Sequence, residues 1–147
     1  MPSQPRTTSS SARSIIASLA QPQRIADTHP FAARFIYSLR LIALHERARR
    51  DPVPELTTRL GSVATAAKAL ALGQAIGLTW PENIHVSRFC CPVLTHDEAT
   101  IATLLDCAER RDRTGFDQAI EGLIRPKRVP ILWHAVVDLI IAEMQAA

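Results

Sequence analysis

Residues 90–98 decide how the chain divides, and they read Cys90-Cys91-Pro92-Val93-Leu94-Thr95-His96-Asp97-Glu98. Pro92 disfavours helix at the residue before it. Thr95 followed three residues later by Glu98 is the pattern of a capping box, in which each side chain bonds the other residue's backbone amide. The acidic residues also suit the positive end of a helix. The stretch therefore predicts an irregular junction up to Thr95 and a helix from there to about residue 110.

Apolar residues at helical spacing predict two helices before this junction. The first covers residues 30–49 and begins at a proline, which suits the first helical turn. The second covers residues 54–76, with Gly77 as its cap, and carries a stripe of 3.5-residue period, namely Leu56, Leu60, Val63, Ala67, Leu70 and Gln74. Between this helix and the junction, residues 84–89 alternate apolar and polar, so we expect one short extended segment there.

Two further helices are expected after the junction. Asp112 or Thr114 caps the first, over residues 115–124, and Pro130 opens the second, over residues 130–145. Pro126, between basic residues, marks the turn that separates them. The predicted fold class is all-α: a compact bundle of about five helices with a disordered N-terminal tail and one short extended segment.

Length, composition and charge describe an ordinary globular domain behind a basic tail. The chain has 147 residues, of which 47% are hydrophobic and only 5% aromatic, so we expect one core of Ala, Leu, Ile and Val. The formal net charge is +3, and three arginines that precede Asp27, the first acidic residue, equal this excess. We expect residues 1–27 to be a disordered tail, which we favour over an organellar presequence, and residues 28–147 to be a single helical domain.

The expected location is the cytoplasm. Three cysteines without regular spacing do not form a disulfide framework, and no secretory signal is visible. The most apolar run, residues 129–142, is interrupted by His134 and Asp138, so we expect no membrane partner. Because the domain after the tail is neutral, its charge gives no reason to expect a nucleic-acid partner.

Side chains that could bind a metal ion lie in and near the junction, namely His85, Cys90, Cys91, His96 and Cys107. Thiolates and imidazoles bind zinc, and a closed site needs four such ligands. The spacing does not match a Cys-x-x-Cys knuckle, and adjacent side chains point apart in an extended chain. We therefore expect Cys90 or Cys91 to be a small buried residue, the histidines to lie on the surface, and no cofactor to be bound, with zinc binding or thiol redox chemistry as the alternative.

A narrow polar stripe of His134, Asp138 and Gln145 lies on the otherwise apolar last helix. His134 and Asp138 are one turn apart and could form a general-base pair, but the sequence places no nucleophile beside them. We interpret the stripe as solvent-facing or as part of a dimer interface, and we expect no enzyme activity.

Basic residues gather at three helix ends, in residues 47–50, 110–113 and 125–128. The arginine fork suits phosphate groups, but cations are favoured at the C-terminal ends of helices in any case. Acidic residues such as Asp51 and Asp112 also lie among them. We favour solvated helix ends over nucleic-acid binding.

The pattern Cys90-Cys91-Pro92-x-x-Thr95-x-Asp97-Glu98 resembles a small uncharacterised bacterial protein family, in which a cysteine-rich step precedes a Thr-x-Asp-Glu helix start. The resemblance covers residues 35–108 and implies no known activity. Family members often have a third adjacent cysteine, and Phe89 or Pro92 occupies that place here.

These features favour a non-enzymatic interaction or regulatory protein. The helices over residues 54–76 and 130–145 carry more apolar surface than a monomer of this size needs, so we expect a homodimer through one of them, on a surface that would also fit another protein partner. A metal- or redox-responsive protein using Cys90 and Cys91 is one alternative. Nucleic-acid binding through the arginine clusters is another.

Overall fold

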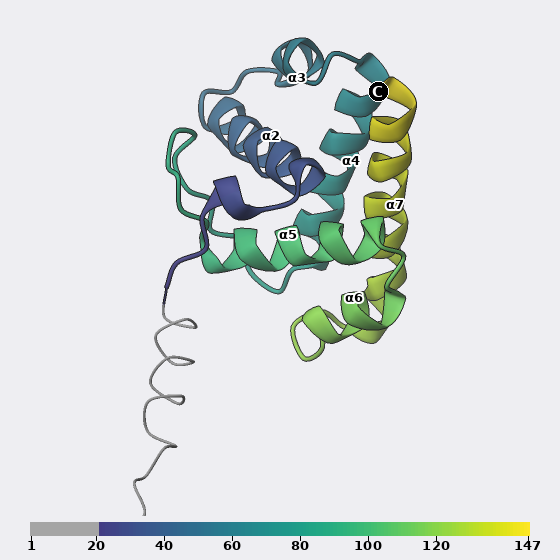
Figure 1. Ribbon diagram of the computed structural model, residues 1–147. Coiled ribbons are helices and arrows are strands. Elements are labelled where there is room, and N and C mark those ends of the chain that lie inside the picture. Colours follow the sequence, from purple (N-terminus) through teal and green to yellow (C-terminus); the bar gives the residue numbers. More distant parts are fainter. Residues whose placement is uncertain (1–20) are drawn as a thin grey trace, which may run out of the picture.

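A computed structural model describes residues 21–147 of the chain. This part folds into six α-helices and two 3-10 turns (Figure 1). The α-helices are α2 (Pro30–Arg47), α3 (Val53–Leu60), α4 (Val63–Thr79), α5 (His96–Glu109), α6 (Arg113–Ala119) and α7 (Val129–Ala146), and the 3-10 turns are η1 (Ile25–Asp27) and η2 (Pro126–Arg128). The all-α prediction is confirmed, but the helices number six rather than five.

Two neighbouring helices, α4 and α7, run antiparallel along one side of the bundle (Figure 1). The Thr65 hydroxyl donates to the Ala142 carbonyl at one end of the pair (3.5 Å), and Arg128 donates to the Leu78 carbonyl at the other (3.0 Å). α2 packs against both α4 and α5, and α5 packs against α7. One apolar core therefore joins these four helices.

The segment before α2 belongs to the packed domain. The Ile25 amide donates to the Pro92 carbonyl (2.9 Å), and the Leu94 amide donates to the Gln23 carbonyl (2.8 Å). The Ile25 side chain is part of the main core. The domain thus includes residues 23–27, which composition assigned to the tail, while residues 1–20 of that tail lie outside the described residues.

Residues 21–147 contain no β-strand, and the single isolated β-bridge there pairs Arg24 with Val93. The short extended segment expected over residues 84–89 is therefore not shown as regular structure. An alternating run forms a strand only where a second strand can pair with it. Here the backbone of this segment is bound instead by side chains of α2 and α5.

The single helix expected over residues 54–76 is two helices, α3 and α4. Gly61 ends α3 in the left-handed conformation, with φ +76°, and the Ser62 hydroxyl caps α4 by accepting from the Thr65 amide (3.3 Å). Gly77 is not a cap, because α4 continues to Thr79. Hydrophobic spacing alone could not reveal the break, since Leu60 and Val63 keep the stripe in register across it.

The buried side of α4 differs from the predicted apolar stripe. The predicted stripe includes Val63, Ala67 and Gln74, and all three are exposed. The buried side consists of Thr65, Ala66, Ala69, Leu72, Ala75, Ile76 and Thr79. The stripe therefore does not mark the buried side of α4, because the small alanines of this helix are compatible with either side.

Gly61→Ala is expected to destabilise the fold by about 1 to 2 kcal/mol, because alanine is strained at positive φ. A Cβ at Gly61 would have open space around it, so the cost is conformational rather than steric. Gly77 is the matched control: it also has open space but lies inside α4, where alanine is favoured by up to about 1 kcal/mol. Urea denaturation should show that Gly61→Ala lowers the free energy of unfolding and that the same change at Gly77 raises it. Equal effects of the two variants would contradict the assignment of Gly61 as a cap.

The helix after α5 starts at one of its two predicted caps. Asp112 accepts from the Gly115 amide (2.8 Å) and begins α6. α6 ends at Ala119, shorter than the expected 115–124, and a turn with Gly122 at φ +79° follows. A residue at positive φ interrupts helical geometry. The helix therefore does not reach Leu123, although the apolar spacing continues that far.

Candidate functional site

The predicted capping box is present at the start of α5. The Thr95 hydroxyl accepts from the Glu98 amide (3.0 Å), and the Glu98 carboxylate accepts from the Thr95 amide (2.9 Å). Thr95 also donates to the His85 carbonyl (2.6 Å), while Asp97 accepts from the His85 amide (2.8 Å). The first turn of α5 therefore fixes both its own start and the segment that precedes the cysteine pair.

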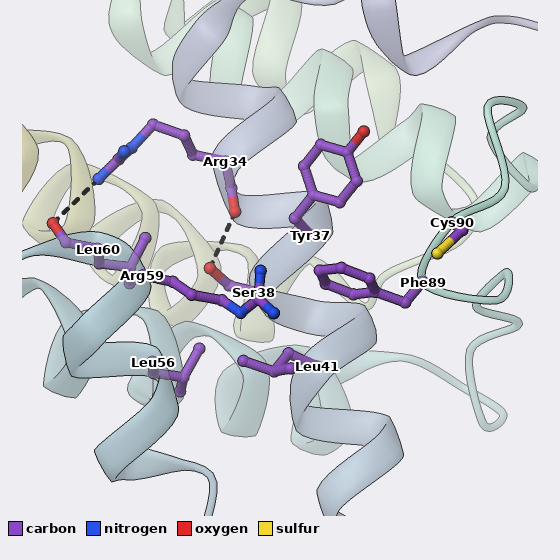
Figure 2. Close-up of a pocket in the computed structure, with 9 residues that line it drawn as sticks. All are labelled: Arg34, Tyr37, Ser38, Leu41, Leu56, Arg59, Leu60, Phe89 and Cys90. Atoms are coloured by element: carbon purple, nitrogen blue, oxygen red, sulfur yellow. Dashed lines mark hydrogen bonds between the residues drawn. The ribbon is translucent and has the colours of Figure 1, made fainter.

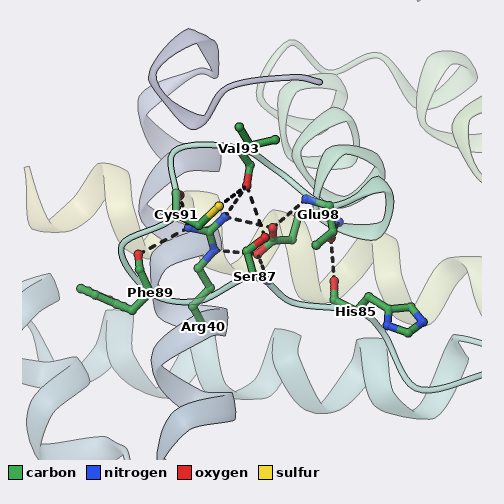
Figure 3. Close-up of polar contacts among 8 residues, drawn as sticks. Arg40, His85, Ser87, Phe89, Cys91, Val93 and Glu98 are labelled. Carbon is green, nitrogen blue, oxygen red and sulfur yellow. Dashed lines mark hydrogen bonds and ion pairs between the residues drawn. The ribbon is translucent and has the colours of Figure 1, made fainter. Parts of the chain in front are cut away.

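Glu98 has a second role that the sequence did not reveal: it is one half of a fully buried ion pair with Arg40 of α2 (Figure 3). Both side chains have 0% exposure. The Arg40 Nε and Nη2 atoms donate to the two carboxylate oxygens, at 2.7 and 3.0 Å. This is the parallel, two-bond geometry in which arginine binds a carboxylate most strongly.

The remaining Arg40 hydrogens bind the backbone of the junction. Nη1 donates to the carbonyls of Cys91 (2.7 Å) and Phe89 (3.4 Å), and Nη2 donates to the carbonyl of Val93 (3.1 Å). All five guanidinium N–H groups therefore have acceptors. Arg40 ties α2, the 89–93 backbone and α5 into one polar centre.

Both charges of this pair persist at neutral pH. Burial raises the pKa of Glu98, but hydrogen bonds from Arg40 and from the Thr95 and Ser87 amides outweigh it, so the pKa lies below its usual value. The hydrogen bond to Glu98 raises the pKa of Arg40. A charge left here without its partner would be costly, because it could not reach water.

The sequence-predicted metal ligands are spread over several environments. Cys90 is exposed, Cys91 is half-buried and Cys107 is buried inside α5. Burial raises the pKa of the Cys107 thiol. His85 and His96 are exposed. Within residues 21–147, no three His, Cys, Asp or Glu side chains lie together in an arrangement that could hold a metal ion, so zinc binding gains no geometric support.

A hollow of about 450 Å³ lies beside the polar centre, between α2, α3 and the turn that carries Cys90 (Figure 2). Its apolar lining includes Leu41, Leu56, Leu60 and Phe89. The Tyr37 and Phe89 rings are in contact, with centroids 5.6 Å apart. Sequence reasoning missed this site, because its walls come from three segments whose packing no local pattern specifies.

Two arginines also line the hollow. Arg34 donates to Glu143 of α7 (2.7 Å) and to the Leu60 carbonyl (3.2 Å). The Arg59 guanidinium lies 4.8 Å from the Phe89 ring centroid, and its Nε donates to Glu55 (3.2 Å). The hollow therefore combines apolar walls with guanidinium groups that remain partly open to solvent.

The polar stripe of α7 lies on the outside of the bundle. His134, Asp138 and Gln145 are exposed, and the Asp138 carboxylate is 3.9 Å from the Lys68 ammonium of α4. His134 has no hydrogen bond to Asp138 among the described contacts. The general-base arrangement considered from the sequence therefore gains no support, and the stripe is solvent-facing in the isolated chain.

By length and composition, one helical segment in the described part could cross a membrane. It spans Pro126–Ala146, with mean hydropathy 1.4 over a window that is 33% buried. The sequence did not lead us to expect this, because His134 and Asp138 interrupt the apolar run. α7 packs against α4 and α5 in the bundle, and the core helix of a globular protein meets the same criterion.

The arginine clusters lie on exposed helix ends and turns. Arg110 pairs with Asp106 (2.9 Å) and Arg113 with Asp117 (2.9 Å), each one turn away on the same helix or its end. Arg128 bonds a backbone carbonyl. The two ion pairs offset part of the positive charge of the 110–113 cluster, so they weaken the case for phosphate binding there.

Comparison with protein-family models, with curated proteins and with solved structures found no match for this chain. The resemblance of residues 35–108 to an uncharacterised bacterial family stays a prediction.

Proposed function

We propose that the protein is a non-enzymatic interaction protein that self-associates through the outer sides of α4 and α7. The observation that carries the proposal is a pair of exposed stripes with 3-4-3-4 spacing. The stripe on α4 consists of Ala64, Ala67, Ala71, Gln74 and Leu78, and that on α7 consists of Ile131, His134, Asp138, Ile141 and Gln145. We call these ten residues the α4/α7 face.

Large apolar side chains on the α4/α7 face are open to solvent. Leu78 is 71% exposed, Ile131 50% and Ile141 47%. Single exposed hydrophobic residues are normal, but here three of them recur along one pair of packed helices, where they alternate with polar residues such as His134 and Asp138. Spacing of three and four residues is also the repeat by which helices of separate chains pack, and the small alanines of α4 would allow close approach.

The charges near the face suit a second copy of the same chain. Lys68 and Asp138 carry opposite signs, and their separation of 3.9 Å is long for an exposed pair, so their attraction within one chain is weak. A two-fold dimer places the same patch against itself. Each lysine could then approach the partner copy's aspartate, and no excess of one sign would oppose contact.

The charges on and near the α4/α7 face also argue against a membrane or a nucleic acid as its binding partner. Helices that lie on membranes are rich in lysine and arginine on their polar side, whereas residues 129–146 contain neither. Nucleic-acid binding requires a positive surface, and the α4/α7 face carries only Asp138 as a charged member. The cytoplasmic location expected from the sequence stays a prediction.

Ile141→Glu is expected to weaken dimerisation at least about tenfold, because it places a charge in an apolar contact. Sedimentation velocity of the full chain at micromolar concentrations measures the effect. Leu44→Glu is the matched control: Leu44 is 52% exposed but lies on α2, and its variant should dimerise like the original protein.

A wild-type chain that is monomeric throughout the micromolar range would refute self-association. Equal effects of the two substitutions would refute the assignment to the α4/α7 face. Co-sedimentation with neutral and anionic lipid vesicles should show no binding, and binding that Ile141→Glu abolishes would identify a lipid surface as the occupant instead.

A further inference from the structure

The hollow between α2, α3 and the Cys90 turn is separate from the α4/α7 face and is not used by self-association. Its volume of about 450 Å³ lies within the range of roughly 300 to 1,000 Å³ that is usual for small-molecule sites. Such sites combine apolar walls with a few polar groups that fix the orientation of the ligand. Both features occur here.

The walls suit a bulky apolar group. Leu41 and Leu56 are buried and present apolar atoms to the hollow, and Phe89 is half-buried. Tyr37 is 39% exposed, although its ring lies against Phe89. An aromatic or branched hydrocarbon placed here would cover ring surface that water now contacts, which is favourable at about 25 cal/mol per Å² of apolar surface.

The polar end of the site is formed by the guanidinium groups of Arg34 and Arg59, each of which pairs with a glutamate through only some of its donors. Nε is the only Arg59 atom with a hydrogen-bond acceptor among residues 21–147, so both terminal amino groups are unengaged there. Arg34 likewise uses Nε and Nη2 but not Nη1. The Phe89 ring beneath Arg59 holds the guanidinium at the hollow. A planar fork of free N–H donors fits a carboxylate.

The geometry points to a binding site for a small organic carboxylate with a bulky apolar body, held by Arg59 at its charged end and by Tyr37, Leu41 and Phe89 along its hydrocarbon. Glu55 does not compete for the free Arg59 donors, because it is bound to Nε and lies 3.1 Å from His45. Ligand and dimer contacts lie on different helices, so binding does not depend on self-association.

Isothermal titration of the full chain with 4-phenylbutyrate tests this site, and the uncharged 4-phenylbutyramide serves as the matched ligand. The acid should bind saturably at one site per chain, and the amide at least about tenfold more weakly. Arg59→Gln should weaken binding of the acid about tenfold, a change of about 1.4 kcal/mol, and should leave the amide unchanged.

Arg113→Gln is the matched control variant. Arg113 also stacks on an aromatic ring, with its guanidinium 5.0 Å from the Trp133 centroid, and it also pairs with an acid one turn away. This variant should bind the acid like the original protein. Equal affinity for acid and amide, no saturable binding by the acid, or equal losses in the two arginine variants would each overturn the assignment.

Discussion

Arg40→Met is expected to destabilise the protein by about 3 to 5 kcal/mol, the usual cost of removing one partner of a buried ion pair. In this variant the Glu98 carboxylate is charged but has neither its arginine partner nor contact with water, because both members of the pair are fully buried. The substitution also leaves the carbonyls of Phe89, Cys91 and Val93 without the donor they share. Urea denaturation followed by circular dichroism measures the loss.

Two further variants separate the ionic contribution from the loss of packing. Arg40→Met combined with Glu98→Gln should recover part of the stability, because glutamine keeps the capping box while no charge remains buried. Arg113→Met breaks an exposed pair with Asp117 and should cost less than about 1 kcal/mol. A loss that small in Arg40→Met would contradict the buried pair.

The acid sensitivity of the protein gives an independent measure of the same pair. The pKa of Glu98 is lowered in the folded state, so its carboxylate stabilises the fold above the unfolded-state pKa. This stability is lost as the pH falls through the lower, folded-state pKa. The doubly substituted variant should lack this part of the acid-induced loss.

The sequence predicted the local half of this centre and missed the distant half. A capping box involves residues three apart, so Thr95 and Glu98 could be recognised without knowing the fold. Arg40 lies 58 residues from Glu98, and only the fold brings them together. One signal was present: Arg40 follows Ile36 by one helical turn, on the apolar side of its helix, where a charge needs a buried partner.

Small residues account for the other differences between the predicted and the observed helices. Gly61-Ser62 carries both a C-cap and an N-cap signal, but the regular stripe on either side favoured one continuous helix. The α4 sequence is so rich in alanine that its buried and exposed sides have similar composition. The hollow beside Phe89 depends on this break, because α3 could not turn across α2 as part of a longer helix.

Leu56→Ala is expected to cost about 2 to 5 kcal/mol, as for other buried leucines. Leu56 is fully buried, and it lies in a small cluster with Leu41, Ile42 and Ala66 that is separate from the main core. α3 has only eight residues, and a helix this short is unstable without tertiary contacts. The loss should therefore appear first as local opening of α3.

Hydrogen exchange read by mass spectrometry distinguishes local from global opening. Amides of α3 should lose most of their protection in Leu56→Ala, while those of α5 and α7 should keep theirs at low denaturant. Leu44→Ala, at an exposed site on α2, is the control and should change stability by less than about 0.5 kcal/mol. Uniform loss across all helices would show that α3 is an integral part of the core.

Ligand binding should depend on whether α3 is closed or open. Leu56, Arg59 and Leu60 all line the hollow from α3, so a chain in which α3 is open has no site for 4-phenylbutyrate. The apparent affinity falls in proportion to the fraction of closed molecules. Conversely, the ligand should restore α3 protection in Leu56→Ala, because it binds the closed form alone. Restored protection in α3, with no change in α7, would link the short helix to the site that it completes.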